Sequence, residues 1–445
     1  MNKVEKYRAY AAQLVRNPDD PIALVNQFAV ISEKKENAAI YLPLAKRAYD
    51  LAPNEISAVF NYGSALHRAG RFEEGLEVYK RVLKLADEEW LPKATHHMGI
   101  AYRALNENRK AAEWYQKAYD IDPNPQYLKD RAIAILAQGK LKEGLEAFEV
   151  RREVAVAKAH ANLGHLISQD KLPDGVVHWQ GEDLTGKTVV VYHEEGSGDF
   201  IQFCRFIPKL RERGAKSVYL CGPVPNLLDL VSDNIQLDGI VPLAGPFDCD
   251  FVVGSMSLPW RCGVDLDQVN GSPYFKTEAA KLPKRGKLNV GLVWRGNPAY
   301  GMDVHRSMAF TAFAPLFDIP GTAFYSLQAG PAGMEVTSAG FDGFVANLEP
   351  FLTSWRETAK VVAALDVVVS VDTAVAHLAG ALGKPVFILT TNASDWRWDR
   401  NSQRTVWYDS ARVIRQKKQD DWAPCIKTVR EELKGMLDGR RRVAA

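Results

Sequence analysis

Apolar residues in the first third of the chain recur at the three- and four-residue spacing of amphipathic helices, and the pattern itself repeats. The segment NYGSALHRAGRFEEGLEVYKRVLKLA, which begins at Asn61, aligns with HMGIAYRALNENRKAAEWYQKAYDID, which begins at His97, at a shift of 36 residues. The aligned pairs include Gly63/Gly99, Leu66/Tyr102, Gly75/Ala111 and Tyr79/Tyr115. Self-similarity at such a period predicts helical hairpins that stack on one another.

These units have small residues at the expected helix crossings, large residues beside them, and Pro53 or Pro123 at the end, which resembles the tetratricopeptide pattern. A degenerate unit at about 21–53 precedes them and another at about 126–152 follows. We therefore expect domain 1–152 to form a short superhelix. Its concave face has two interpretations: a site for a partner or substrate peptide, or a structural role in supporting the next domain or in self-association.

The helical period stops at residues 153–185, where turn residues predict a linker. Beyond it, short apolar runs alternate with amphipathic segments, which predicts parallel sheets covered by helices on both faces. The expected strands are TVVVYHE, SVYLCG, GIVPL, FDCDFVVG, KLNVGLVWRG, TAFYSLQAG, LDVVVSVD and PVFILT. The expected helices are 199–213, 224–232, 309–317, 355–365 and 373–383.

A Lys-rich segment with Pro and Gly, residues 275–289, separates these elements into two groups. We expect two doubly wound, Rossmann-like α/β domains, 186–280 and 288–436, with a cleft between the carboxyl ends of their strands. The predicted fold class is therefore multidomain, with an α-helical superhelix followed by two such domains.

Charge and cysteine content narrow the function classes. The net charge of +2 gives no sign of a basic segment that binds polyanions, although it is compatible with a local basic groove. The five cysteines lack CxxC spacing, which is typical of thiols in a reducing compartment. The N-terminus is too charged for a signal peptide, and no apolar run approaches the ~20 residues of a membrane span. We expect a cytoplasmic protein.

Several blocks of the second half keep a common order between about 179 and 432: HEEGSGDFIQFCRFIPKL, MSLPWRCGVDLDQVNGSPYF, VGLVWRGNP, HRSM, SLQAG, SVDTAVAHLAGALGKPV and DWRW. Together they resemble the C-terminal module of bacterial and phage tetratricopeptide proteins that is related to the heptosyltransferases, glycosyltransferase family 9, of the GT-B fold. The resemblance implies a nucleoside-diphosphate sugar as co-substrate in the C-terminal half-site, with no other cofactor. It places an acceptor against the N-terminal half.

The block VVVSVDTAVAHLAGALG predicts a strand and then a helix that Asp372 or Thr373 caps. Free N–H groups and the helix dipole at such a start can hold a diphosphate. The resemblance favours this donor site, whereas a cap alone would make Asp372 structural. His377 either contacts the donor, braces Asp372, or is merely packed. The predicted donor contacts of this block are Asp372, Thr373, Ala374, Val375 and His377.

A polar loop after the strand that ends at Trp294 carries Arg295 and Arg306. A departing nucleoside diphosphate gains charge, which a guanidinium stabilises. By resemblance to the heptosyltransferases, a basic residue near Arg306 contacts the diphosphate, and the alternative is a solvated loop charge. The remaining predicted donor-side residues are Trp294, Arg295, Gln328 and Arg397. Gln328 could equally cap its loop, and the aromatic surroundings of Arg397 could equally be loop packing.

The stretch VVVYHEEGSGDFIQFCRF predicts a strand, a tight turn and a helix. By the resemblance, its Gly-Asp pair contains the proposed base, Asp199, which would take the proton of the acceptor hydroxyl. We expect the helix start to lower the pKa of Asp199, and simple capping is the alternative. Related proteins usually have Gln and Leu at Glu195 and Ser197, and Glu195 is a rival base. The predicted acceptor side is Glu195, Gly196, Ser197 and Gly198, with glycines that permit close approach of a substrate.

The pairs Asp248/Asp250 and Asp265/Asp267 have the spacing of a metal-binding DxD motif, but we interpret both as structural and expect no metal. The sequence favours a glycosyltransferase that moves a sugar from a nucleoside diphosphate to a hydroxyl by inverting, metal-independent displacement. One alternative is an acceptor that is a hydroxymethylated nucleic-acid base. Another is a non-catalytic repeat scaffold with an inactive module. The donor base and sugar, the acceptor and the oligomeric state stay open.

Overall fold

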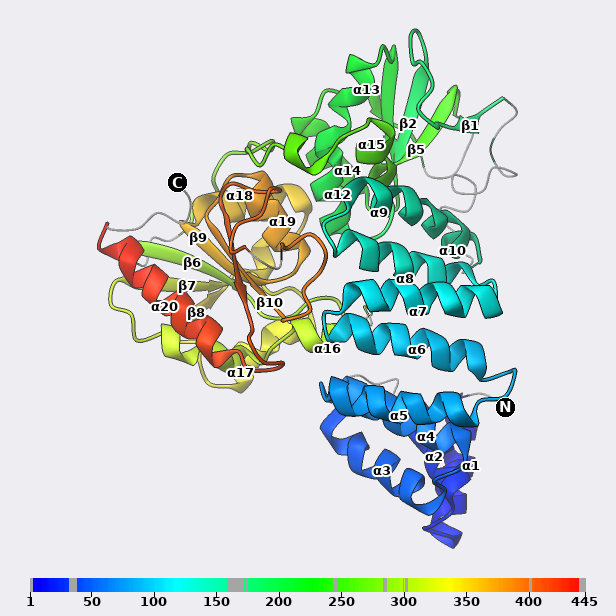
Figure 1. The fold of residues 1–445 in the computed structure, drawn as a ribbon. Helices are drawn as coiled ribbons and strands as arrows, with labels where there is room; N and C mark the ends of the chain where they lie inside the picture. The colour runs from blue at the N-terminus through cyan, green and yellow to red at the C-terminus, as the bar shows by residue number, and fades with distance from the viewer. Residues whose placement is uncertain are drawn as a thin grey trace. The chain divides into compact units, whose positions relative to one another are not determined.

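The computed structural model describes residues 3–31, 38–157, 172, 175–242, 247–282, 286–298, 300, 303–399 and 402–439. The chain divides into two compact units, residues 1–138 and 139–445 (Figure 1). This division falls inside the last predicted repeat and not at residue 152. Most of the predicted linker, residues 158–171, 173 and 174, lies outside the described residues, as do 283–285 of the Lys-rich segment.

The described part of the first unit is wholly helical. Its helices are α1 (Lys3–Arg16), α2 (Pro21–Ile31), α3 (Ala38–Leu51), α4 (Ile56–Arg68), α5 (Phe72–Leu85), α6 (Leu91–Ala104), α7 (Asn108–Ile121) and α8 (Pro125–Leu136). Consecutive helices from α3 to α8 pack against each other (Figure 1). The two aligned units are the pairs α4–α5 and α6–α7, which confirms the predicted repeat. The degenerate unit contains α2 and α3, and α1 was not predicted.

Glycines let the two helices of each aligned unit approach closely. A Cβ atom at Gly63 would lie 2.9 Å from Cε1 of Tyr79, and one at Gly99 would lie 2.5 Å from Cδ1 of Tyr115. Both tyrosine rings are fully buried in these contacts. No larger residue fits at either position without moving a ring, so the small-against-large pairing predicted from the repeat is confirmed.

The second unit begins with α9 (Leu141–Ala147), η2 (Phe148–Val150) and α10 (Arg151–Ala157). Arg151 donates from Nε and Nη2 to the two carboxylate oxygens of Glu194 at 3.1 and 2.7 Å, and from Nη1 to Glu149 at 2.7 Å. Its Nη2 also donates to Ser257 Oγ at 2.7 Å. Burial disfavours the charge of Arg151, but the two carboxylates outweigh it and raise the pKa of the guanidinium. This network explains why a repeat-like segment belongs to the second unit.

The first sheet of this unit has the order β1-β5-β2-β3-β4 and is parallel throughout. Its strands are β1 (Val177–His178), β2 (Thr188–Tyr192), β3 (Ser217–Cys221), β4 (Gly239–Ile240) and β5 (Phe251–Gly254). The helices between and after them are α12 (Ser197–Phe203), η4 (Cys204–Phe206), α13 (Pro208–Glu212), α14 (Pro225–Asn234), η5 (Ser255–Ser257), α15 (Leu258–Arg261) and η6 (Leu266–Gln268). The strand order reverses between β2 and β5, so the turn after β2 opens at a topological switch point.

The second sheet has the order β11-β10-β9-β6-β7-β8 and is also parallel. Its strands are β6 (Leu288–Val293), β7 (Thr322–Ser326), β8 (Val345–Asn347), β9 (Val367–Val371), β10 (Val386–Thr390) and β11 (Ala411–Arg415). The helices are α16 (Asp303–Arg306), η7 (Phe310–Leu316), η8 (Pro331–Met334), α17 (Glu335–Ser338), η9 (Glu349–Phe351), α18 (Trp355–Ala364), α19 (Ala374–Ala381) and α20 (Ala423–Leu437). The switch point lies between β6 and β9. The two parallel sheets confirm the predicted fold class.

Some predicted elements differ in detail. The helix expected at 199–213 is broken into α12, η4 and α13, because Pro208 lacks an N–H group and begins a new helix. The helix expected at 309–317 is the 3-10 segment η7, which contains Pro315. The strands β1, β8 and β11 and the helix α20 were not predicted. None of the helices in the described ranges is long and apolar enough to cross a bilayer.

We predict that Arg151→Ala lowers the free energy of unfolding of the full chain by about 3–5 kcal/mol, because it leaves Glu194 and Glu149 buried without their shared cation. Arg151 is only 2% exposed, so water cannot replace the lost contacts. Urea unfolding measures the change. The control is Lys209→Ala, which removes an exposed ion pair to Glu212 at 3.5 Å and should cost less than about 0.5 kcal/mol. Equal losses in both variants would contradict the structural role of the network.

Candidate functional site

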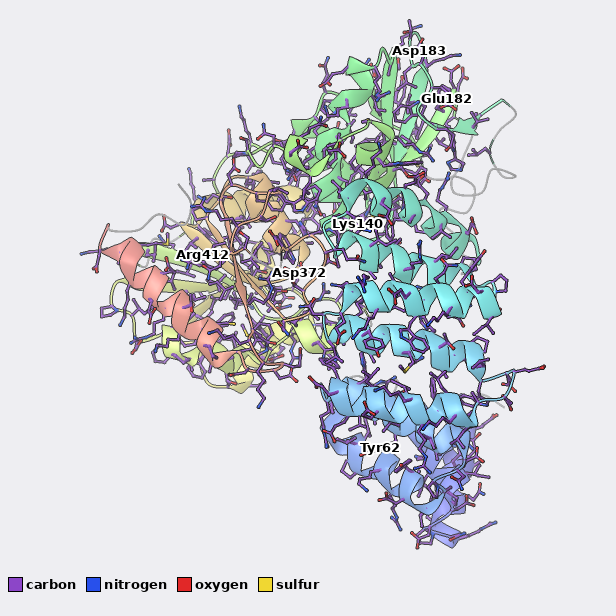
Figure 2. The ribbon with its side chains drawn as sticks, viewed as in Figure 1. Tyr62, Lys140, Glu182, Asp183, Asp372 and Arg412 are labelled. Carbon is purple, nitrogen blue, oxygen red and sulfur yellow. The ribbon has the colours of Figure 1, made fainter. Side chains whose placement is uncertain are left out.

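The candidate site forms where α12 and α19 begin. The turn after β2 leads into α12, and Asp372, which is labelled in Figure 2, directly follows β9. A Cβ atom at Gly198 would lie 2.9 Å from Cδ2 of His377 and 3.3 Å from Cα of Ala374. The absence of a side chain at Gly198 therefore lets the two helix starts touch. We predicted that Gly198 lets a substrate come close to the backbone. In the structure, the start of α19 comes close to it instead.

Asp199 lies at this contact with both carboxylate oxygens engaged. Its Oδ2 accepts from the backbone N–H of Gly196 at 2.9 Å, and its Oδ1 forms an ion pair with Arg397. Burial raises the pKa of Asp199 although Arg397 opposes the shift. The expected lowering is therefore wrong, because desolvation outweighs the helix start. The side chain is still 25% exposed, so a ligand can reach it.

The other residues of this turn have distinct positions. Glu195 is exposed and has a left-handed backbone with φ of 58°, which is strained for a residue with a side chain. Gly196 occupies the N-cap position of α12 and Ser197 is the first residue of the helix. The structure thus brings the four predicted acceptor-side residues to one turn beside Asp199, although Gly198 packs inward.

Arg397 is enclosed by protein groups. Its Nη1 donates to Asp395 at 2.8 Å, its Nε donates to the side-chain oxygen of Gln202 at 2.5 Å, and its Nη2 pairs with Asp199. The guanidinium also lies 4.6 Å from the ring centre of Trp396, and the side chain is 8% exposed. These contacts favour a role in positioning Asp199 over direct contact with a donor.

The start of α19 has no side-chain cap. Thr373 is the N-cap residue, but neither it nor Asp372 accepts a hydrogen bond from the first turn, so the predicted cap is wrong. Instead, the hydroxyl of Thr373 is 2.9 Å from that of Ser370. The helix start at Ala374 and Val375 therefore keeps its orphan N–H groups uncapped by side chains, as an anion site requires.

Burial raises the pKa of Asp372 to about 6, and the nearby Asp395 carboxylate adds to the shift while Arg306 opposes it. Its side chain is 14% exposed. Burial lowers the pKa of His377 well below its usual value, so its ring is neutral. His377 Nδ1 lies 2.8 Å from the Tyr408 hydroxyl, whereas Nε2 is 4.0 Å from Asp372, too far for a hydrogen bond. The ring is braced by Tyr408 and does not itself brace Asp372.

Arg306 faces the same region from the loop after β6. Its Nε donates to Asp303 at 2.8 Å, and its guanidinium lies 4.8 Å from the ring centre of Tyr300. Burial disfavours its charge, but the Asp372 and Asp303 carboxylates outweigh this effect and raise its pKa. Arg306 is thus a fixed cation beside Asp372, on the β6–β9 side where the strand order reverses.

Three other predicted donor residues are engaged in holding strand ends. The Gln328 side-chain oxygen accepts from the backbone N–H groups of Trp294 and Arg295 at 3.1 and 2.9 Å. The Trp294 side chain is fully buried in the sheet core, and the Arg295 guanidinium pairs with Glu335. These contacts favour the loop-capping interpretation of Gln328 and a packing role for Trp294.

Sequence reasoning missed the partners that hold the site together. Asp303 precedes Arg306 by three residues, a helical spacing that could have indicated their pairing. Gln202 and Tyr408 gave no comparable signal, because their partners are distant in sequence.

Asp250 accepts from Lys187 Nζ at 2.9 Å and from the Thr188 N–H at 2.8 Å. These contacts support the structural interpretation of the Asp248/Asp250 pair.

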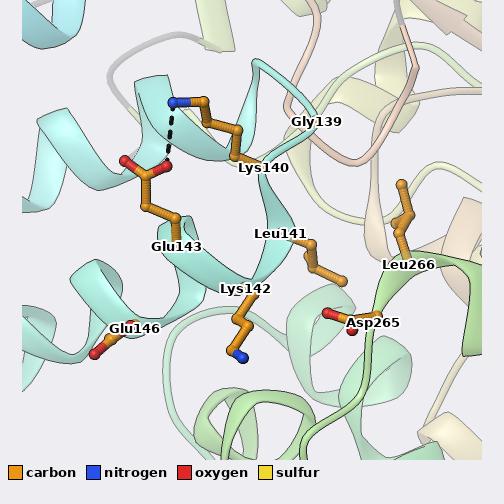
Figure 3. Close-up of a pocket in the computed structure, with 8 residues that line it drawn as sticks. All are labelled: Gly139, Lys140, Leu141, Lys142, Glu143, Glu146, Asp265 and Leu266. Atoms are coloured by element: carbon orange, nitrogen blue, oxygen red, sulfur yellow. Dashed lines mark ion pairs between the residues drawn. The ribbon is translucent and has the colours of Figure 1, made fainter.

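A separate hollow of about 470 Å³ lies between α9 and the residues around Asp265 (Figure 3). It is lined by Gly139, Lys140, Leu141, Lys142, Glu143, Glu146, Asp265 and Leu266. Lys140 pairs with Glu143 at 3.1 Å, so its charges are mixed and partly neutralised. None of the predicted site residues lines it, and the convergence of helix starts is the stronger candidate for chemistry.

Two protein families match parts of the chain. Residues 55–124 match the tetratricopeptide repeat, and residues 328–431 match glycosyltransferase family 9 (heptosyltransferase). The second match includes β9 and α19, with Asp372, His377 and Arg397. The chain therefore combines a tetratricopeptide repeat with a C-terminal glycosyltransferase family 9 domain, as the sequence blocks predicted.

Similar proteins extend over different parts of the chain. Protein FlbA of Caulobacter vibrioides is 25% identical over 464 aligned positions, which cover 96% of this chain and 74% of FlbA. A glycosyl transferase family 9 structure from Veillonella parvula is 13% identical, with a TM-score of 0.40, over 57% of this chain and 92% of that one. A crystal structure of MamA is 21% identical, with a TM-score of 0.30, over 34% of this chain and 88% of that one.

We predict that Asp372→Asn stabilises the protein at pH 7.5 by about 1–3 kcal/mol. The raised pKa means that the folded protein retains a proton which the unfolded chain loses between about pH 4 and pH 6, so stability falls as pH rises through this range. Thermal unfolding at pH 7.5 and pH 4 measures the difference, which should be mostly lost at pH 4, close to the ordinary pKa of 3.8. The exposed Asp342→Asn is the control. A variant no more stable than wild type at pH 7.5 would show that the charge of Asp372 is not disfavoured.

Proposed function

We propose that the chain is a glycosyltransferase that moves a sugar from a nucleoside diphosphate to an acceptor hydroxyl. The observation that carries this proposal is the contact between the starts of α12 and α19, which puts a carboxylate from one switch point beside an uncapped helix start from the other. The match of residues 328–431 to glycosyltransferase family 9 supports the same class.

The leaving diphosphate is assigned to the start of α19 and to Arg306. The N–H groups of Ala374 and Val375 carry the partial positive charge of the helix, and Arg306 adds a full charge. Both are fixed before the donor arrives, so stabilising the departing anion needs little reorganisation. A guanidinium and the partial positive charge of a helix start can both stabilise the departing anion, and for this reason we propose a metal-independent transfer.

Asp199 is assigned as the base that removes the proton of the acceptor hydroxyl. Its raised pKa suits this task, because a base is most effective when its pKa approaches the working pH. Arg397 and the Gly196 N–H fix its orientation, and the remaining carboxylate lone pairs stay available to a hydroxyl. Attack from the side opposite the diphosphate would invert the anomeric centre.

Asp372 does not fit a direct contact with phosphate, because an ionised carboxylate repels an anion. We assign it to the donor in another way: it orients Arg306 and accepts a hydrogen bond from a hydroxyl of the donor. When an anionic diphosphate approaches, the neutral form of Asp372 becomes more favourable still, and its pKa of about 6 puts that protonation within reach.

We predict that a nucleoside diphosphate raises the melting temperature of the full chain, and that Arg306→Ala weakens its binding at least about tenfold, the loss expected for a charge-assisted contact. The measurement is a thermal-shift titration with uridine, guanosine and adenosine diphosphates. Arg430→Ala, which removes an exposed ion pair to Asp318, is the control and should bind normally. Absence of a shift with every nucleotide would reject the donor site and favour a non-catalytic scaffold.

We further predict that Asp199→Asn lowers the rate of sugar transfer by about 10²–10⁴-fold, the usual contribution of a general base, with little change in donor affinity. Release of nucleoside diphosphate is measured with the nucleotide sugar that gives the largest thermal shift. Asp342→Asn is the matched control. Full turnover by Asp199→Asn would exclude Asp199 as the base, and the test should then pass to Glu195.

A further inference from the structure

Arg151 and Glu194 meet where the strand order of the first sheet reverses, between β2 and β5. Glu194 lies two residues after β2, and its Oε1 accepts from the backbone N–H of Met256, two residues after β5, at 2.9 Å. Arg151 of α10 donates two hydrogen bonds to the same carboxylate. Such a switch point commonly receives a ligand, but here it receives side chains of the protein itself.

The Glu194 side chain has little freedom to move. It is 8% exposed, and a Cβ atom at Gly254 would lie only 2.2 Å from its Oε1. Both carboxylate oxygens accept hydrogen bonds, Oε2 from Arg151 and Oε1 from Arg151 and Met256. Burial raises the pKa of Glu194, and the Arg151 guanidinium opposes this shift. The position of Glu194 therefore depends on Arg151.

Glu194 directly precedes the turn that presents Asp199. The backbone of Glu195 is left-handed, with φ of 58°, a conformation that a residue with a side chain keeps only when its surroundings enforce it. The next residue, Gly196, donates its N–H to Asp199 Oδ2 at 2.9 Å. If Glu194 were released, Glu195 could relax to an ordinary conformation, and this would turn the Gly196 N–H away from Asp199.

We infer that Arg151 is a positioning residue for Asp199, and that it acts through Glu194 and the turn that follows. The inference rests on the proposed function, in which Asp199 is the base. A buried ion pair is a weak source of net stability, because desolvation offsets its attraction, but it fixes the direction of a side chain. Two parallel hydrogen bonds from a guanidinium define an orientation that a lysine ammonium cannot. The segment ahead of the first sheet thereby supplies a part of the candidate site.

Hydrogen exchange in the full chain tests the effect on the turn without any substrate. Arg151→Lys keeps the charge but loses the paired hydrogen bonds, and Glu194→Gln keeps the shape but loses the charge. We expect the Gly196 amide, resolved by fragmentation mass spectrometry, to exchange at least about fivefold faster in both variants. The control is Arg211→Lys, which alters an ion pair with Asp238 in the same domain and should leave this amide unchanged. Wild-type exchange at Gly196 in both test variants would overturn the inference.

Kinetics at a temperature well below the melting point of each variant separate positioning from stability. We expect the release of nucleoside diphosphate from the nucleotide sugar to slow at least about tenfold, with the affinity for nucleoside diphosphate unchanged. Burial raises the pKa of Asp199 and the Gly196 N–H lowers it, so loss of this contact should move the acidic limb of the pH–rate profile to higher pH. Arg397, Glu195 and Asp395 also act on Asp199, and they are the same in every variant.

The two ways in which the inference can fail are distinguishable. A lower melting temperature with a wild-type rate and pH profile would show that Arg151 is only structural, and Glu194→Gln decides this point if Arg151→Lys does not fold. Absence of nucleotide binding by wild type would instead overturn the proposed function and, with it, the role of Asp199 as the base. Adding Glu195→Asn to Arg151→Lys should return the Gly196 exchange toward the wild-type rate, because asparagine tolerates a left-handed backbone. Exchange that stays as fast in this double variant would contradict the role of the turn.

Discussion

The candidate site depends on one steric constraint: the start of α12 can touch the start of α19 only because Gly198 has no side chain. Any Cβ atom there would meet the His377 ring and the Ala374 backbone. This contact joins the ends of β2 and β9, which lie at the switch points of two separate sheets. It also brings Arg397 within reach of Asp199, so that an ion pair spans the same junction.

The contact between the starts of α12 and α19 also has an electrostatic consequence. Asp199, Asp372 and Asp395 share the partly buried region with Arg306 and Arg397, so carboxylates outnumber guanidinium groups. Burial raises the pKa values of Asp199 and Asp372, and the neighbouring carboxylates add to both shifts while the guanidinium groups oppose them. Under the proposed function, donor binding and proton uptake at Asp372 are therefore linked, because an added anion makes the neutral carboxyl still more favourable.

Much of this architecture could be predicted from local sequence patterns. The elements that the sequence analysis missed are those without such a pattern. Strands such as β2, β6 and β9 are mainly apolar runs, whereas β8 has three residues and β11 contains two arginines among its five residues. Asp372 was predicted because it directly follows a buried strand, whereas Asp199 and Arg306 were predicted from the resemblance to the heptosyltransferases. The partner of Asp199 was not, because Arg397 lies 198 residues away and no local periodicity encodes such a distance.

A glycine permits close packing in both units, but the consequence of that packing differs between them. Gly63 and Gly99 admit a tyrosine ring, so the contact they permit is apolar and specifies helix packing alone. Gly198 permits a contact of the same kind, but the surfaces it joins are a carboxylate-bearing turn and an uncapped helix start. Close packing there confines charges that would otherwise be solvated. Whether such a glycine is structural or functional therefore depends on the polarity of the two surfaces that it lets touch. Only the three-dimensional structure shows which surfaces these are.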